Sequence, residues 1–319
     1  DDVYRQEGIN SLQDLVAKLE AGNDYTSPSN ALYQYVAYHI LSGAYNLGKM
    51  QAFDTDDATS KNWETLNTEA LIKVSLVDDA FYLNYADENS RCQFLEDGSD
   101  IQAKNGYVHQ VNGYMPVAEA QPETVLFDVT NYEEIKNWIE AGNGDFEEMK
   151  FQTTHETTEG NADVSTLGLY DFSLNNPSPW RPGSSKPSWF VIYFTSKSNN
   201  DWKNAQNHDM LMLNLGTNGW ISFTTPVIVK GKYKVSIQFG NAKSMDFIAN
   251  ATNGSNGGQM EFSIDDQNVT SAYPYTSPDV HKGGSYLFSY VVYDEIEFTS
   301  TSTHTFKLVM KDPAASTNS

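Results

Sequence analysis

Strict alternation of apolar and polar residues is the feature that most constrains how this chain can fold, and it recurs in the second half. It runs through residues 233–239 (YKVSIQF) and 260–264 (MEFSI), and through the apolar positions of 211–215 and 304–310. A period of two buries one face of a β-strand and leaves the other face polar. Clusters of Gly, Asn and Pro separate these short segments. The alternation therefore predicts an all-β antiparallel sandwich.

The first 50 residues follow a helical period instead. Apolar residues from Ile9 to Leu19 recur every three or four positions, which is the spacing of one helix face. Ser11 with Asp14 resembles a capping box that starts this helix, and Gly22 is expected to end it.

A second helix is expected after Ser27-Pro28, because proline suits the first turn of a helix. Its apolar face runs through Leu32, Tyr35, Val36, His39 and Ile40, and Gly43 is expected to end it. Strand-like runs follow at 70–77, 81–85 and 107–115, with Asp78-Asp79 as a turn between the first two. Helices followed by strands predict an α+β domain over residues 1–117.

Residues 116–124 (PVAEAQPET) mark a boundary between two domains. They contain two prolines and few large apolar residues, which is typical of a linker. We place the linker at residues 118–124 and the sandwich at residues 125–319. Within the sandwich we expect a helix over 132–141 and a hairpin turn at Asp265-Asp266.

Charge and cysteine content exclude several classes of function. The chain of 319 residues carries 42 acidic and 20 basic residues, a formal charge of −22. That balance argues against nucleic acid and against an anionic membrane surface as partners. No apolar run is long enough to span a membrane as a helix. Cys92 is the only cysteine, so neither an internal disulfide nor a cysteine-based zinc site can form.

Sequence motifs for catalysis and metal binding are absent. The chain has no Gly-x-Ser-x-Gly elbow, phosphate loop or dinucleotide fingerprint, and its histidines lack zinc-binding spacing. Asp54 begins an acidic loop, but Thr59 and Thr65 occupy the positions where a calcium loop needs Gly and Glu. We therefore predict no catalytic residues, no metal ligands and no cofactor.

Aromatic residues in polar loops are the best candidates for ligand binding. A sugar needs an exposed flat ring beside hydrogen-bonding side chains. Trp202 lies near Asn200 in a run of polar residues, Tyr273 and Tyr275 flank Pro274, and Trp180 lies in a proline-rich loop. We take Trp202, Tyr273, Tyr275, Asn200 and Trp180 as candidate ligand-binding residues. The alternative is that these rings fold back onto the sandwich as lids.

Two segments of the first part resemble the conserved boxes of fasciclin domains. Residues 32–43 (LYQYVAYHILSG) resemble the Tyr-His box, and residues 105–116 (NGYVHQVNGYMP) resemble the closing box. The resemblance covers roughly residues 1–117. It lacks the family's first strand, of which only the end is matched at residues 1–4, so we expect the chain to begin inside the domain. We also expect its end to cut into the second domain.

His39 and His109 look at first like a catalytic or metal-binding pair. Each lies among apolar residues, where a single histidine is more often a hydrogen-bonded core residue. The histidines at matching positions in fasciclin domains are structural, so the resemblance implies the same role for His39 and His109. His304 shares an apolar face with Phe306 and Leu308, so we expect it to pack in a core as well.

The second part resembles galactose-binding-like jelly rolls. Residues 220–226 (WISFTTP), 231–237 (GKYKVSI) and 303–309 (THTFKLV) are similar to strands of that fold. Many such domains bind carbohydrate, and many hold a structural calcium ion, which leaves calcium open here without named ligands. Fasciclin domains joined to such a sandwich are typical of secreted or surface-anchored bacterial lipoproteins.

These observations together predict a non-catalytic protein outside the cytoplasm that acts in cell adhesion or carbohydrate binding. The expected partners are a glycan or another surface protein, at the cell surface or an outer membrane. Two alternatives stay open: an enzyme that acts on polysaccharide through two facing carboxylates, and a structural spacer in a surface assembly.

Overall fold

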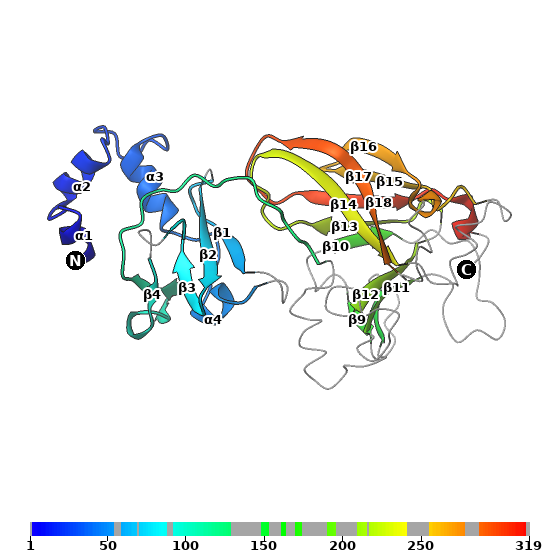
Figure 1. The fold of residues 1–319 in the computed structure, drawn as a ribbon, viewed down its shortest axis with the longest axis horizontal. Coiled ribbons are helices and arrows are strands. Elements are labelled where there is room, and N and C mark those ends of the chain that lie inside the picture. The colour runs from blue at the N-terminus through cyan, green and yellow to red at the C-terminus, as the bar shows by residue number, and fades with distance from the viewer. Residues whose placement is uncertain are drawn as a thin grey trace. The chain divides into compact units, whose positions relative to one another are not determined.

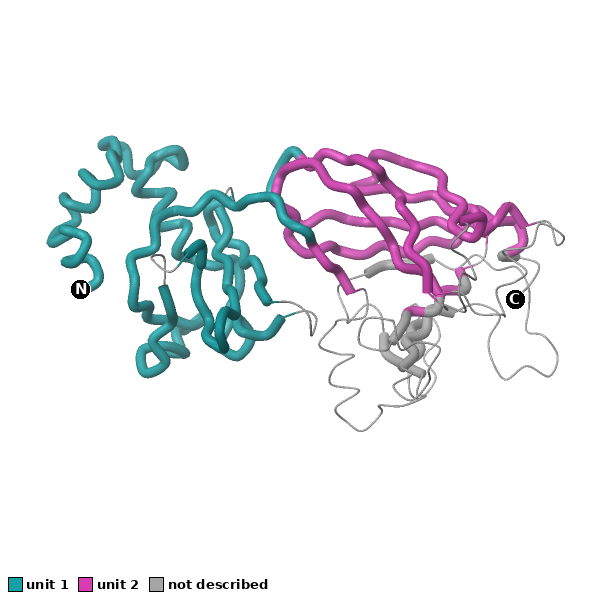
Figure 2. The backbone as a smooth tube through the Cα atoms, in the orientation of Figure 1, with its two compact units in different colours: residues 1–124, 299–302 teal, residues 125–298, 303–319 magenta. Residues whose placement is uncertain are grey.

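The computed structural model describes residues 2–53, 59–68, 70–87, 92–128, 148–152, 161–163, 170–173, 190–195, 209–215, 217–240, 255–277 and 287–316. The chain divides into two compact units (Figure 2). Unit 1 comprises residues 1–124 and 299–302, and unit 2 comprises residues 125–298 and 303–319. The described part is mostly antiparallel sheet, with four short α-helices and no closed barrel.

Unit 1 begins with the four helices and continues in short strands (Figure 1). Its described elements are α1 (Asp2–Gln6), α2 (Leu12–Lys18), α3 (Ala31–Tyr38), α4 (Leu47–Met50), β1 (Ser60–Glu64), β2 (Leu71–Val77), β3 (Ala80–Leu83), β4 (Phe94–Leu95), β5 (Ile101–Ala103), β6 (Gly106–Val108) and β7 (Gln110–Val111). A single 3₁₀ turn, η1 (Glu96–Gly98), follows β4.

The predicted start of α2 is confirmed, but its end is not. The Ser11 hydroxyl accepts a hydrogen bond from the Asp14 N–H, as a capping residue does. The helix ends four residues before Gly22, because Glu20 takes the left-handed conformation with φ of 53°. The Ala21 N–H then reaches the Val16 carbonyl and closes the helix without glycine.

The second helix begins later than predicted. It starts at Ala31 rather than at Pro28, because the Asn30 side chain accepts hydrogen bonds from the Leu32 and Tyr33 N–H groups and so caps it. It also ends at Tyr38, well before Gly43. Its buried residues are Leu32, Tyr35, Ala37 and Tyr38, while Val36, His39 and Ile40 are exposed, which corrects the predicted apolar face.

The strands of unit 1 form a three-stranded antiparallel sheet in the order β1-β2-β3 and two further pairs, β4–β7 and β5–β6. The predicted turn at Asp78-Asp79 is confirmed, and both residues have positive φ, as a two-residue hairpin turn requires. Side chains of α3, α4 and the strands share one core that includes Tyr38, Met50 and Trp63.

The segment predicted as a linker lies against unit 1. Glu119 forms a β-bridge with Ala70, and the Glu123 carboxylate accepts hydrogen bonds from the Lys73 ammonium and the Asn62 side chain. Residues 118–124 are therefore anchored at three points on the β1-β2-β3 sheet.

The described part of unit 2 consists of strands and short 3₁₀ turns (Figure 1). Its described elements are β8 (Glu148–Gln152), β9 (Asn161–Asp163), β10 (Tyr170–Ser173), β11 (Phe190–Thr195), β12 (Asp209–Asn214), β13 (Trp220–Thr224), β14 (Gly231–Gly240), β15 (Met260–Ile264), β16 (Gln267–Ala272), η5 (Pro274–Thr276), β17 (Leu287–Phe298), β18 (Thr305–Met310) and η7 (Pro313–Ser316). The helix predicted over 132–141 lies outside the described residues.

The described strands of unit 2 form three sheets. A five-stranded antiparallel sheet has the order β10-β13-β18-β15-β16, the long strands β14 and β17 pair with each other, and four strands follow the order β12-β11-β8-β9. Side chains from the five-stranded sheet and from the β14–β17 pair fill one apolar core, which includes Ile221, Phe262, Tyr293 and Leu308. This arrangement is consistent with a β-sandwich.

The alternation that predicted strands of the sandwich is confirmed at β12, β14, β15 and β18. The turn at Asp265-Asp266 is also confirmed: it joins β15 to β16, and both residues have positive φ. In β18, Leu308 and Met310 are buried while Thr305 is exposed, as a period of two requires.

Tyrosine hydroxyls from β17 satisfy backbone groups at the last strand of the five-stranded sheet. The Tyr293 hydroxyl donates to the Asn268 carbonyl at 2.7 Å, and the Tyr290 hydroxyl accepts from the Tyr273 N–H at 3.4 Å. Strand β16 is the last described strand at one border of this sheet. Backbone N–H and C=O groups at such a border lack a neighbouring strand to bond to.

One buried carboxylate organises the loop before β15. Asp312 is fully buried, and its Oδ2 accepts hydrogen bonds from the Ser255 hydroxyl and from the N–H groups of Asn256 and Gly258, at 2.7–3.0 Å. Its Oδ1 accepts from the Ala314 N–H at 2.8 Å. The backbone of residues 255–258 thus wraps the carboxylate, which replaces water for all four donors.

We expect Asp312→Ala to destabilise unit 2 by about 3 kcal/mol, because buried N–H groups lose their acceptor. Asp312→Asn should lose less, since its remaining oxygen can still accept from the Ser255 loop. Urea unfolding of the full chain measures both changes. An alanine variant within about 0.5 kcal/mol of the parent protein would contradict this role for the carboxylate.

Candidate functional site

The structure tests the position of only two of the predicted ligand-binding residues. Asn200, Trp202 and Trp180 lie outside the described residues. Tyr275 is 5% exposed, and its hydroxyl donates to the Gly240 carbonyl at 2.9 Å. The expectation that this ring is exposed is therefore wrong.

Tyr275 lies within the 3₁₀ turn η5, whereas Tyr273 lies just before it. The turn directs the Tyr275 ring into the core against Phe239 and Phe288, with ring centroids 6.4 and 5.4 Å apart. Tyr273 precedes the turn and is 40% exposed. Its carbonyl accepts a hydrogen bond from the Thr276 hydroxyl at 2.7 Å, which fixes the backbone of the turn. Tyr273 thus remains an exposed candidate ring.

A polar surface with one aromatic ring lies on the outer side of the five-stranded sheet. Ile221, Phe223, Phe262 and Leu308 point into the core, so the residues that alternate with them point outward. The outward side chains at the centre, which we call the Trp220 face, are Trp220, Ser222, Glu261, Ser263, Lys307 and Val309.

Strand register places these side chains in two rows across β13, β18 and β15. Trp220 lies opposite Val309, and Val309 lies opposite Glu261. In the next row Lys307 lies between Ser222 and Ser263. Paired residues on one face lie about 5 Å apart, so all six share the outer side of the sheet, where Ser263 is only 8% exposed.

The Lys307 ammonium holds the Trp220 ring in place. Its Nζ lies 4.5 Å from the centroid of the half-buried ring and 3.7 Å from the Asp266 carboxylate. The Lys311 ammonium lies 4.0 Å from the Glu261 carboxylate on the same side of the sheet. The half-buried ring thus lies beside one ammonium group, on a sheet face that also carries carboxylate and hydroxyl groups, and these groups together suit a sugar.

Sequence reasoning did not select Trp220, although the signal was present. The run WISFT was used to predict a strand, and Ile221 and Phe223 are its inward residues. Their burial sends Trp220 and Ser222 to the opposite face of the sheet, away from the described core. An aromatic residue at an otherwise polar position of an alternating strand is therefore the sequence signal for an exposed ring.

His39 lies at the end of α3 and not in the core. Its Nδ1–H donates to the Tyr35 carbonyl at 2.8 Å, and its ring packs on the Tyr35 ring with centroids 4.4 Å apart. Desolvation by neighbouring groups lowers the pKa of His39, and the hydrogen bond to the carbonyl opposes part of that shift. The imidazole side chain therefore caps the helix.

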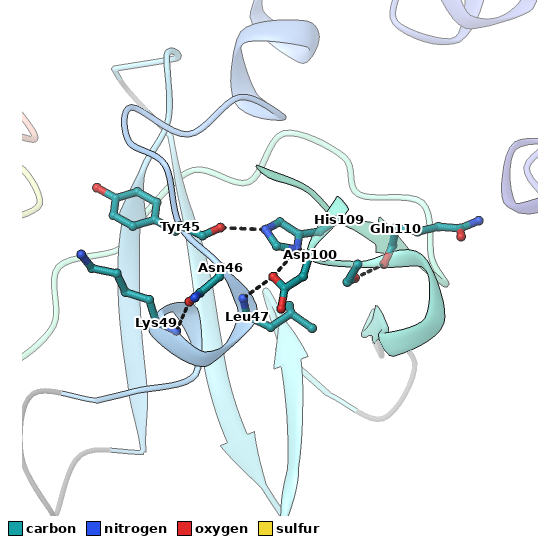
Figure 3. Close-up of polar contacts among 8 residues, drawn as sticks. Tyr45, Asn46, Leu47, Lys49, Asp100, His109 and Gln110 are labelled. Atoms are coloured by element: carbon teal, nitrogen blue, oxygen red, sulfur yellow. Dashed lines mark hydrogen bonds and ion pairs between the residues drawn. The ribbon is translucent and has the colours of Figure 1, made fainter. Parts of the chain in front are cut away.

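His109 joins three backbone segments of unit 1 (Figure 3). Its Nε2–H donates to the Tyr45 carbonyl at 2.8 Å, and its Nδ1 accepts from the Asp100 N–H at 3.3 Å. The Asp100 carboxylate in turn accepts from the Leu47 N–H at 2.8 Å. Both ring nitrogens have backbone partners, so the neutral imidazole is fully hydrogen-bonded.

His304 packs in the core of unit 2 and pairs with a turn residue. It is 9% exposed, and its Nδ1–H donates to Asp265 Oδ2 at 2.6 Å. Asp265 Oδ1 accepts from the Thr305 N–H at 2.8 Å. Burial raises the pKa of Asp265, but the hydrogen bonds from His304 and Thr305 outweigh it and lower the pKa overall.

Among the described residues, no group of three or more His, Cys, Asp or Glu side chains is arranged to hold a metal ion. None of the helices in the described part is long and apolar enough to cross a membrane.

Comparison with known proteins matches part of the chain to one family. Residues 181–319 match the model of a family described as "Domain of unknown function (DUF5108)". The match covers less than half of the chain and includes the strands that form the Trp220 face. No curated protein and no solved structure matches the chain.

The Asp265 pair predicts a loss of stability at acid pH. Because the pKa of Asp265 is lowered by folding, its contribution is present above the unfolded pKa of about 4 and is lost as pH falls through the folded value. Asp265→Asn should cost about 1 kcal/mol at pH 7, since the exposed side of the carboxylate is screened.

Thermal unfolding from pH 7 to pH 3 measures this contribution. Asp266→Asn is the matched control, because it makes the same charge change in the same turn at a carboxylate 85% exposed. A difference between Asp265→Asn and the parent protein that persists unchanged at pH 3 would contradict the assignment.

Proposed function

We propose that this chain is a non-catalytic, glycan-binding protein of a bacterial surface and that the Trp220 face binds the sugar. The observation that carries the proposal is the half-buried Trp220 ring, with the Lys307 ammonium 4.5 Å from its centroid, on a polar sheet face. The tyrosine at position 273 adds an exposed ring at the end of β16.

Binding would use both the apolar C–H face and the polar hydroxyl groups of the sugar. The apolar C–H face of the sugar stacks on the exposed part of the Trp220 ring, and its hydroxyls bond to the Ser222 hydroxyl and the Glu261 carboxylate. The Lys307 ammonium holds the ring in advance, so little side-chain freedom is lost on binding. This is a shallow surface suited to recognition of a chain rather than to enclosure of a small molecule.

The fold proposals support the same function. We propose a fasciclin-like α+β domain in unit 1 and a galactose-binding-like jelly roll in unit 2. The short helices packed on a small antiparallel sheet support the first, and the shared core of the five-stranded sheet and the β14–β17 pair supports the second. From these resemblances we infer a role in adhesion, outside the cytoplasm, at the surface of a bacterial cell or as a secreted lipoprotein.

A polysaccharide-acting enzyme is the competing proposal. It would need two carboxyl groups across a cleft, one of them with a raised pKa. The described carboxyl groups whose pKa is shifted, at Asp14, Asp24 and Asp265, are all lowered by hydrogen bonds. A lowered pKa keeps a carboxylate ionised and does not suit a general acid.

We expect Trp220→Ala to reduce binding to a glycan array by about tenfold or more, because the stacking surface is removed. Trp220→Phe should keep most of the binding, since it keeps a flat ring. Trp202→Ala tests the competing candidate ring, and it should bind like the parent protein if the Trp220 face is the site.

The other outcomes separate the competing functions. A chain that binds no glycan would overturn the proposed function, and release of shorter sugars from a polysaccharide would make it an enzyme. Binding abolished by Trp202→Ala but not by Trp220→Ala would move the site into the loop of Trp202.

A further inference from the structure

Helix α2 has an apolar side that the described part of unit 1 does not bury. None of its residues is buried, and Leu12 at its start is 59% exposed. The helix contributes no residue to the core that Tyr38, Met50 and Trp63 share. In Figure 1, α1 and α2 lie beyond α3, away from the strands of unit 1. Part of the apolar surface of α2 is therefore accessible to another molecule.

An open groove lies along this side of α2, and we call it the α2 groove. The residues that form it belong to the helix and to the segment just after it, and they include Leu12, Val16, Ala17, Glu20, Ala21 and Tyr25. Its volume is about 490 Å³, which is within the usual range for a binding pocket. Ala17 and Ala21 have small side chains, so they leave room for a side chain of another molecule.

Hydrogen bonds hold the loop that carries Tyr25. The Asp24 carboxylate accepts from the Thr26 N–H at 3.1 Å and from the Thr26 hydroxyl at 2.7 Å. The Asn30 side chain, which also caps α3, donates to the Gly22 carbonyl at 2.9 Å. The backbone on both sides of Tyr25 is thus positioned before any ligand binds, so little conformational freedom is lost on binding.

The α2 groove is negatively charged. Among the described residues, Glu20 is the only charged residue that lines it, and its exposed carboxylate has no ion-pair partner there. The Lys18 ammonium lies 3.0 Å from the Glu7 carboxylate and 5.2 Å from the centroid of the Tyr114 ring. Residues 1–30 contain six acidic and two basic residues. A basic partner would therefore be attracted and an acidic partner repelled.

The apolar lining and the negative charge together define the partner. Leu12 and Tyr25 are 59% and 47% exposed, and their removal from water favours association. We propose that the α2 groove docks a protein segment that presents a leucine or phenylalanine side chain beside a lysine or arginine. A second copy of this chain suits the groove less well, because its net charge of −22 opposes association.

This docking surface is independent of the Trp220 face. It lies in unit 1 and uses none of the residues of that face. Trp220→Ala should therefore leave peptide binding unchanged, and loss of peptide binding would not affect the proposed glycan site.

Methyl NMR spectra of the full chain, labelled at leucine, valine and alanine, test the proposal. The probe is a peptide of two Lys-Leu-Phe-Lys repeats. Repeats of Glu-Leu-Phe-Glu and of Lys-Ser-Ser-Lys are its comparisons at matched ionic strength. The methyl signals of Leu12, Val16 and Ala17 should move and saturate with the probe. Each comparison peptide should bind about tenfold more weakly or worse, because one reverses the charge and the other lacks apolar side chains.

Variants of the groove show whether the peptide binds there. Leu12→Ser should weaken binding of the probe about fivefold or more, and Glu20→Gln about threefold. The matched controls are Leu66→Ser, at a leucine 55% exposed, and Glu96→Gln, at an exposed glutamate. They make the same changes outside the groove and should alter the affinity less than about twofold. Unchanged signals of core methyl groups verify that each variant is folded.

Four results would overturn the proposal. They are groove signals that stay still with the probe, equal binding of either comparison peptide, equal weakening by the control variants, and movement of the groove signals when the chain alone is concentrated. The last result would assign the α2 groove to a second copy of this chain.

Discussion

Burial of one side of the five-stranded sheet determines what its other side presents. The sheet packs Ile221, Phe262 and Leu308 into the core shared with β14 and β17. Since a pleated strand alternates, each buried position sends its neighbour outward, and Trp220 and Lys307 meet on that outer side. The recognition surface that we propose thus follows from the packing of the core on the opposite side of the same strands.

Side-chain hydrogen bonds between segments that are distant in the sequence position several loops. Asp312 gathers the loop at residues 255–258, His304 ties β18 to the turn at Asp265, and His109 ties Tyr45 to the segment at Asp100. Each tie joins segments separated in sequence, and each acts on loops that have little apolar surface of their own. In both units, these hydrogen bonds position loop segments in addition to the hydrophobic contacts of the cores.

The sequence predicted the elements whose signals are local. Alternation gave β14, β15 and β18, and paired aspartates gave the turns at Asp78 and Asp265. The predicted helix ends were less accurate, because nearby residues can also cap a helix. Asn30 caps α3 instead of Pro28, and Glu20, with its positive φ, ends α2 without glycine. Tyr275 is buried against Phe239 of β14 and Phe288 of β17. These residues are distant in the sequence, so the local pattern around Tyr275 could not predict its burial. Trp220 was predictable in principle, since its strand neighbours already showed which way it points.

The tyrosine hydroxyls of β17 affect how easily another chain can pair with the border strand β16. A strand at the border of a sheet invites the backbone of another chain to continue the ladder, which is how ordered aggregates begin. The Tyr293 hydroxyl already occupies the Asn268 carbonyl at that border of the described sheet. The Asn268 carbonyl is therefore already hydrogen-bonded, so a second chain that pairs along β16 would have to do without this acceptor, which makes the strand a poorer template for another copy.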